Sequence, residues 1–146
     1  MNIKKLVWSI AIPIIMGIIV SFIMMPFNDY SNLNQPPFAP PAIVFPIVWT
    51  ILYILMGISS YIVWTNNGNL GTYYLQLILN GLWSIIFFVF KLRLLAFVWI
   101  IALIFLVIKM IREFLLVNKI SGYLQIPYLL WLIFAAYLNL GVYMLN

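Results

Sequence analysis

The stretch Asn34-Gln35-Pro36-Pro37-Phe38-Ala39-Pro40-Pro41 interrupts an otherwise apolar chain and runs directly into residues 42–53, which read AIVFPIVWTILY. Proline lacks a backbone N–H and restricts the residue before it, so a run with four prolines in six residues cannot lie inside a helix. Pro41 stands where a helix can begin, because the first turn needs no intrahelical donor. We expect a stiff loop here that covers a pocket, followed by a helix that lines the pocket with Trp49 and Tyr53.

The composition around this stretch is that of a membrane protein. Apolar residues make up 67% of the 146 residues and charged residues only 6%, whereas a soluble domain has roughly a quarter charged residues. The net charge of +5 comes from residues near predicted helix ends. This pattern suits anionic lipid headgroups rather than nucleic acid.

Five apolar segments with short connections predict an all-α membrane protein, a bundle of five transmembrane helices in one domain, 1–146. A segment of about 20 apolar residues is long enough to cross ~30 Å of hydrocarbon. The fifth segment is expected to break at Pro127. The predicted helices are 6–25, 42–64, 73–90, 94–113 and 122–145, and the loop that covers the pocket is 26–41.

The first segment admits two readings. A cleaved signal peptide would have a shorter apolar region and end in a small-x-small site, which Phe22-Ile23-Met24-Met25 does not offer, so we expect a retained span. Pro13, Gly17 and Ser21 lie four residues apart on one face, and small residues at this spacing let another helix approach closely. Ordinary helix packing and a homodimer contact both fit that face.

The lysines and arginines predict the orientation of the bundle. Lys91 and Arg93 lie on the side of the proline-rich loop, and the remaining five basic residues lie on the other: Lys4, Lys5, Lys109, Arg112 and Lys119. The excess of positive charge marks the cytoplasmic side. We therefore expect a multi-pass protein of the cell membrane with its N-terminus in the cytoplasm and the proline-rich loop outside.

Aromatic and polar residues recur at helical spacing in three of the predicted spans. Such spacing places them on one face of each helix. An unpaired amide in hydrocarbon is costly, so the two asparagines should face the bundle. The stripes are Pro46, Trp49, Tyr53, Ser60 and Trp64 in the second span; Asn80, Trp83, Ser84 and Phe87 in the third; and Tyr128, Trp131, Ala135 and Asn139 in the fifth.

These stripes support two interpretations. They could be helix-packing contacts, with residues such as Trp64 forming an interfacial belt. Alternatively, Trp49, Trp83 and Trp131 converge on a flat-walled cavity suited to a flat apolar ligand. The three indoles lie deep within their spans, and the pattern alone supports the two interpretations about equally.

The residue types leave little for acid–base or metal chemistry. The chain has no cysteine and no histidine, and Asp29 and Glu113 are its only acidic side chains. The predicted orientation puts these two on opposite sides of the membrane. We therefore predict no catalytic residue and no metal site of the usual kind, and haem could enter only with Tyr or Met as axial ligand or with none.

Four runs of sequence, taken together, resemble the signature of the TspO/MBR family, which includes the translocator proteins, the tryptophan-rich sensory proteins and the peripheral-type benzodiazepine receptors. Their order and spacing agree along essentially the whole chain. The runs are 36–41 (PPFAPP) with 45–57 (FPIVWTILYILMG), 76–84 (QLILNGLWS) with Phe87-Phe88, 127–131 (PYLLW), and 134–139 (FAAYLN).

This resemblance implies a five-helix bundle, commonly dimeric, with a pocket closed by the first loop. It implies that porphyrins such as protoporphyrin IX and haem are bound as ligands, with no obligatory cofactor. Light-dependent breakdown of porphyrin has been proposed for bacterial members of the family. If the resemblance extends to this activity, the pocket tryptophans would react by oxidation. The ligand-binding residues expected from the stripes and the motif positions are Tyr30, Trp49, Tyr53, Asn80, Trp83, Phe87, Trp131 and Ala135.

The sequence departs from the family pattern at the loop and at the C-terminus. Phe38 occupies the position of the usual loop tryptophan, and few charges precede Pro36, which would loosen the loop. No basic residue follows Tyr137, so the cholesterol motif of animal members is not expected.

We predict a porphyrin-binding sensory or translocator protein in a lipid membrane. Two alternatives from other classes stay open. One is a small transporter, although the spans lack the midplane charge that ion coupling usually uses. The other is a structural partner of other membrane proteins that binds no porphyrin.

Overall fold

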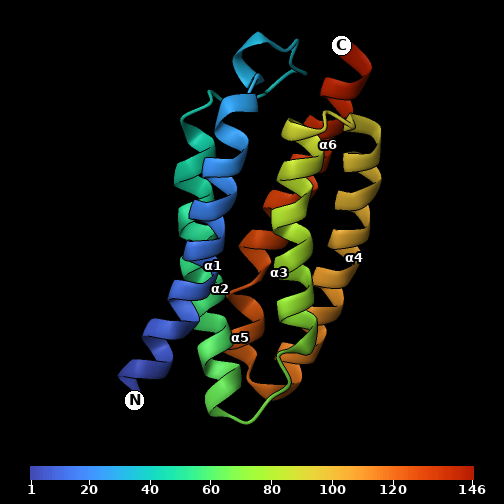
Figure 1. Ribbon diagram of the computed structural model, residues 1–146. Coiled ribbons are helices and arrows are strands. Elements are labelled where there is room, and N and C mark those ends of the chain that lie inside the picture. Colours follow the sequence, from blue (N-terminus) through green and yellow to red (C-terminus); the bar gives the residue numbers. More distant parts are fainter.

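Five long apolar spans run side by side in the computed structural model, which describes residues 1–146 and contains no strand (Figure 1). The spans are 19 to 27 residues long, enough to cross a bilayer. The prediction of an all-α, five-helix membrane bundle is confirmed. The elements are α1 (Ile3–Met24) with the 3-10 turn η1 (Met25–Phe27), the 3-10 turn η2 (Tyr30–Asn32), α2 (Val44–Thr65), α3 (Gly71–Ser84) with the π-helical turn η3 (Ile85–Val89), α4 (Arg93–Val117), α5 (Lys119–Tyr123) and α6 (Ile126–Leu145).

Local capping explains where several helices begin. The side chain of Asn2 accepts a hydrogen bond from the Lys5 N–H at 3.2 Å, so α1 starts at Ile3 instead of residue 6. Asn118 caps α5 in the same way, accepting from Ile120 N–H at 2.8 Å. The last span therefore begins at Lys119 rather than at residue 122.

The last span is broken where Pro127 predicts a break. α5 ends at Tyr123, Leu124 and Gln125 make a turn, and Pro127 lies in the first turn of α6, where no N–H donor is needed. α5 and α6 thus lie one after the other on the same path through the bundle.

The small residues of α1 and α2 allow these two helices to touch. A Cβ atom added to Gly57 would lie 2.5 Å from the Cα atom of Ile10, which is too close for any side chain. A Cβ atom added to Gly17 would lie 2.7 Å from the ring of Tyr53. The small-residue face of α1 is therefore used for packing within the chain.

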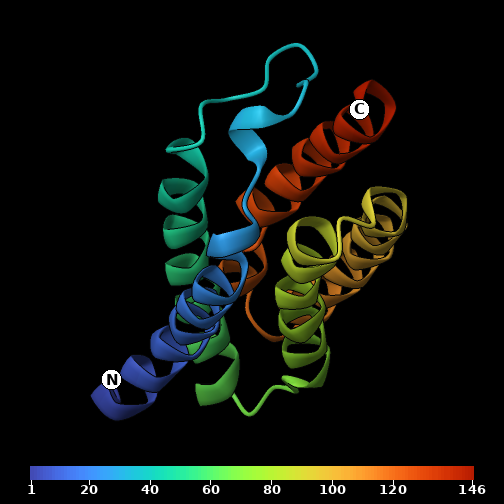
Figure 2. The ribbon, with the colours of Figure 1, turned by 45° about the horizontal axis from the view of Figure 1, so that its top comes forward.

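The two ends of the bundle differ in what they carry. One end holds the proline-rich loop, the α3–α4 turn and the C-terminus, and the opposite end holds the N-terminus, the α2–α3 loop and the α4–α5 turn (Figure 1). The loop arches from the ends of α1 and α2 towards the C-terminal end of α6 (Figure 2). This arrangement places it over the space between the helices.

Candidate functional site

A cavity of about 870 Å³ lies under the proline-rich loop between α1, α2, α3 with η3, and α6. Most of its lining residues are apolar. Seven of the eight residues predicted for the site lie on its wall: Tyr30, Trp49, Tyr53, Trp83, Phe87, Trp131 and Ala135. All three of the deep tryptophans therefore meet at one hollow.

Aromatic rings from α2, α6 and the loop form one side of this cavity. The ring centres of Trp49 and Trp131 are 6.5 Å apart and nearly perpendicular, at 88°. Trp49 also stacks on Tyr53, with centres 5.5 Å apart. Phe45 lies between Trp131 and Tyr30, with its ring centre 5.8 Å from the first and 4.9 Å from the second. Edge-to-face and offset contacts of this kind stabilise a continuous aromatic wall.

The opposite side is built by the end of the third span. Trp83 and Phe87 stack with ring centres 5.3 Å apart. The π-helical turn, in which Phe90 N–H bonds Ile85 C=O at 3.1 Å, widens the helix at this point. Turns of this type occur frequently at functional sites. The sequence prediction of a plain helix to residue 90 did not foresee it.

Asn80 lies behind the wall and is not among the lining residues. Its side-chain oxygen accepts a hydrogen bond from the Tyr53 hydroxyl at 2.8 Å, and its NH₂ group donates to the Tyr128 hydroxyl at 2.9 Å. Asn80 therefore positions Tyr53, whose ring faces the cavity. Helical spacing on α3 predicts which side of the helix Asn80 lies on. It does not predict that a side chain of another helix, Tyr53, separates Asn80 from the cavity.

Few polar atoms on the wall are left without a partner. Asn139 is occupied, because its oxygen accepts from Trp83 Nε1–H at 3.0 Å and its NH₂ group donates to the Arg93 carbonyl at 2.8 Å. The buried Trp131 Nε1–H and the Gln35 Oε1 have no partner within the protein. They offer a ligand one donor and one acceptor.

The loop over the cavity, residues 28–43, is held together by its own hydrogen bonds. The Tyr30 hydroxyl donates to the Pro40 carbonyl, and Gln35 Nε2 donates to the Tyr30 carbonyl at 3.0 Å. Burial of the Tyr30 phenol raises its pKa above the usual value. We refer to residues 28–43 as the lid.

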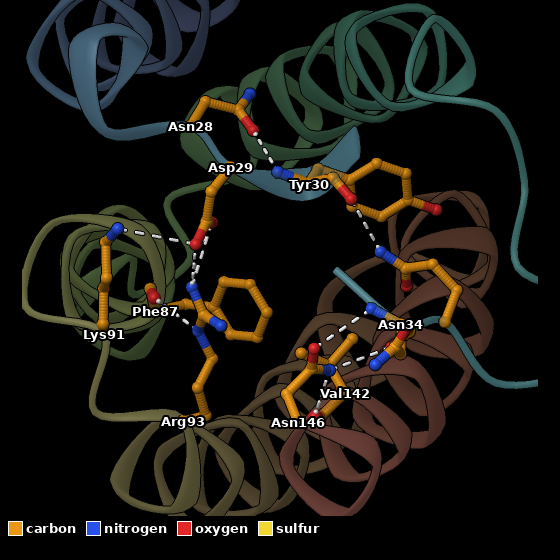
Figure 3. A network of polar contacts seen from close by, with 10 residues as sticks. Asn28, Asp29, Tyr30, Asn34, Phe87, Lys91, Arg93, Val142 and Asn146 are labelled. Atoms are coloured by element: carbon orange, nitrogen blue, oxygen red, sulfur yellow. Dashed lines mark hydrogen bonds and ion pairs between the residues drawn. The ribbon is translucent and has the colours of Figure 1, made fainter. Parts of the chain in front are cut away.

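The lid is also tied to α6. Asn34 N–H donates to the side-chain oxygen of Asn146 at 3.0 Å, and the Asn146 NH₂ group donates back to the Asn34 carbonyl at 2.9 Å (Figure 3). The Tyr137 hydroxyl donates to the Pro37 carbonyl at 2.7 Å. These bonds make up for the scarcity of charge in the lid, which had predicted a looser loop.

An ion cluster anchors the other end of the lid. Arg93 Nη2 lies 2.9 and 3.0 Å from the two carboxylate oxygens of Asp29, and Lys91 Nζ lies 3.5 Å from one of them (Figure 3). Partial burial disfavours the charged carboxylate, but the hydrogen bond and charge of Arg93 and the charge of Lys91 outweigh it. The pKa of Asp29 therefore lies below its usual value.

Arg93 links this anchor to the cavity wall. Its guanidinium carbon lies 4.7 Å over the ring centre of Phe87, and its Nε–H donates to the Phe87 carbonyl at 3.1 Å. The sequence prediction placed Asp29 and Arg93 on the same side of the membrane but did not pair them. Their pairing follows from the meeting of two loops 64 residues apart.

The chemistry available on the wall is that of aromatic rings, amides and thioethers. The lining residues of the types that can bind haem iron axially are Met24, Met25, Tyr30 and Tyr53. The contribution of α1, including Gly17 and Ser21, was not predicted for the site. Its small-residue stripe was the available signal, because it showed which face of α1 approaches a neighbour.

Comparison with known proteins gives a consistent result over the chain. The sequence model of the TspO/MBR family matches residues 9–145. A tryptophan-rich protein TspO of Archaeoglobus fulgidus is 39% identical over 100% of this chain and 99% of its own length. A tryptophan-rich sensory protein of Cereibacter sphaeroides is 34% identical over 85% of this chain and 80% of its own, and the translocator protein of Ovis aries is 34% identical over 77% and 72%.

Proposed function

The chain belongs to the TspO/MBR family, and from this premise we propose that it binds flat apolar molecules, porphyrins such as protoporphyrin IX and haem in particular, in the cavity under the lid. The observation that carries the proposal is the meeting of Trp49, Trp83 and Trp131 around one hollow. Membership of the family agrees with an integral multi-pass membrane protein. The names of its relatives indicate a translocator or sensory protein.

The size and the walls of the cavity support a ligand of this class. Ligand pockets in proteins are about 300–1,000 Å³ and mostly apolar, with a few polar groups that fix orientation, and this cavity holds about 870 Å³. Indole and phenol faces at right angles and in stacks offer flat surfaces to a planar ring. The free Trp131 N–H is a donor for a carboxylate at the edge of such a ring.

The same arrangement supports a role in carrying or reporting the ligand. The lid is bonded to α4 through Asp29 and to α6 through Asn34, so opening of the lid requires these contacts to change. We propose that the lid faces the outside of the cell, because five of the seven basic residues lie at the opposite end of the bundle.

The test is a titration of the purified protein with protoporphyrin IX, followed by tryptophan fluorescence. We expect saturable quenching, and Trp49→Ala or Trp131→Ala should raise the dissociation constant by about tenfold or more, as loss of a buried aromatic anchor does. Trp64→Ala is the matched control. It removes an indole that lies outside the cavity at the N-terminal end of the bundle, with Lys5 5.0 Å over its ring.

The variants are compared by their dissociation constants and not by their fluorescence amplitudes, because removing any of the six tryptophans lowers the amplitude. Equal constants for the wild type and all three variants would refute binding at the aromatic wall. Absence of saturable quenching in the wild type would refute the proposed ligand class.

A further inference from the structure

A polar cluster lies in the interior of the bundle and meets the cavity wall at one of its ends. It begins at Tyr53, continues through Asn80 to Tyr128, and from the Tyr128 hydroxyl to Gln76 Oε1 at 2.7 Å. Gln76 and Tyr128 are at most 1% exposed. Such a chain is unusual inside hydrocarbon, where every polar group needs a partner within the protein.

The far end of this cluster is incomplete. Gln76 Nε2 and both Nε2 and Oε1 of Gln125 are buried and have no hydrogen-bond partner within the protein, and the Tyr73 hydroxyl, which lies near Ser60, makes no hydrogen bond of good geometry. Tyr73, Gln76 and Gln125 are at most 1% exposed. Buried polar side chains in proteins are bonded to protein or to ordered water in the large majority of cases, so these four atoms indicate a bound partner.

The residues that carry the unpaired atoms lie at similar levels of α3 and α6. Tyr73, Gln76 and Asn80 share one face of α3, being three and four residues apart, and Gln125 precedes Tyr128 by three residues at the start of α6. α3 and α6 run in the same direction (Figure 1). Because Tyr128 bonds Gln76, we expect Gln125, three residues before Tyr128, to lie level with Tyr73, three residues before Gln76.

The backbones of α3 and α6 are not in close contact, and long side chains such as Tyr128 bridge the distance between them. Gln125 lies in the turn that separates α5 from α6, where the helix is interrupted.

The chemistry of the unpaired atoms identifies the partner. Two are amide NH₂ groups, which only donate, one is an amide oxygen, which only accepts, and one is a phenol, which does both. A cation would satisfy the oxygens and leave the two NH₂ groups unpaired. Water both donates and accepts, and a buried water makes about three hydrogen bonds.

We propose that the bundle holds a site for about one or two internal water molecules, bonded by Tyr73, Gln76 and Gln125, which completes a polar chain running from the middle of the bundle to Tyr53 on the cavity wall. The amides of Asn80 and Gln76 in this chain do not exchange protons readily. The site therefore orients Tyr128, Asn80 and Tyr53 and does not conduct protons.

The test is radiolytic hydroxyl labelling of the protein in lipid nanodiscs, read out by mass spectrometry, because bound water becomes the source of label for the side chains that touch it. We expect Tyr73 to be labelled several-fold more than Phe114. Phe114 is fully buried beside Tyr73, with ring centres 6.0 Å apart, and has no polar group. Labelling of Tyr73 no greater than that of Phe114 would overturn the proposal and would instead indicate direct pairing of the two glutamine amides.

A pair of variants assigns the label to this site. Gln125→Leu should lower labelling of Tyr73 several-fold, whereas Gln35→Leu, which removes the same amide from the lid, should leave it unchanged. Labelling of Tyr73 that is the same in Gln125→Leu as in the wild type would show that the water is not held by Gln125 and would overturn the assignment. If Gln125→Leu fails to fold, the comparison of Tyr73 with Phe114 in the wild type still decides.

Discussion

At the scale of single residues, the cavity depends on small side chains as much as on the large rings. Ala135 lies one turn after Trp131 on α6, is 5% exposed and lines the cavity. A larger residue there would fill space between Trp131 and the third span. The site therefore requires a small side chain at position 135 in addition to the tryptophans.

Ala135→Leu tests this requirement. The added isobutyl group overpacks the wall, which costs about 1–3 kcal/mol, and we expect weaker binding of protoporphyrin IX with the helical content retained. Ala102→Leu is the control, since Ala102 is exposed on α4 outside the cavity. Wild-type affinity in Ala135→Leu, measured by the same fluorescence titration, would show that the ligand does not use this part of the wall.

At the scale of elements, the lid and the π-helical turn act through one side chain. Arg93 bonds Asp29 at the lid, Phe87 in the turn, and through its carbonyl Asn139 on α6. Three elements thus meet at a residue whose side chain is only 11% exposed. Loss of the Asp29 contact should free the lid without removing any group from the cavity wall.

We expect Asp29→Asn to speed the release of protoporphyrin IX. An ion pair of this exposure contributes about 1 kcal/mol, which corresponds to release faster by about fivefold, measured by displacement in stopped flow. Glu113→Gln is the matched control, because Glu113 pairs only loosely with Lys109, at 3.9 Å, at the other end of the bundle. Equal release rates in Asp29→Asn and the wild type would contradict a role of this ion pair in closing the lid.

The pKa of Asp29 predicts how the release rate of the wild type depends on pH. The pKa of Asp29 is lowered in the folded protein, so its ion pair is complete above the ordinary aspartate pKa of about 3.9 and is lost only as the pH falls through the lower folded value. The contribution of this ion pair to the release rate should therefore be constant from pH 8 to 5. In Asp29→Asn this contribution is absent at every pH.

At the scale of the whole molecule, charge is distributed unequally between the two ends. Lys91 and Arg93 lie at the lid end of the bundle, paired with Asp29 of the lid, and the remaining basic residues lie at the end that carries the N-terminus. The membrane orientation follows from this imbalance by the positive-inside rule.

Single cysteines can test the orientation directly, because the chain has none of its own. Phe38→Cys, at a 90% exposed position of the lid, should react with a membrane-impermeant maleimide added to intact cells. Asn66→Cys, after α2 at the opposite end, should react only once the cells are opened. The reverse pattern would place the lid in the cytoplasm.

The sequence predicted the spans well because hydropathy and proline act locally. It also predicted that Trp49, Trp83 and Trp131 would face the bundle, since helical spacing fixes a face. It did not reveal that Asn80 lies behind Tyr53, or that Asp29 meets Arg93, because these depend on how separate helices are rotated and on how two loops meet. The π-helical turn after Ser84 was missed because its sequence, IIFFV, has the same apolar character as an ordinary helix.

The hydrogen bonds inside the lid have a kinetic consequence. Since Tyr30 is bonded to Pro40, and Gln35 to Tyr30, we expect the lid to move as one stiff unit rather than residue by residue. Ligands that differ greatly in affinity would then share one upper limit on their exchange rate. This limit would be the rate at which the lid opens, and it would not depend on how tightly the aromatic wall binds the ligand.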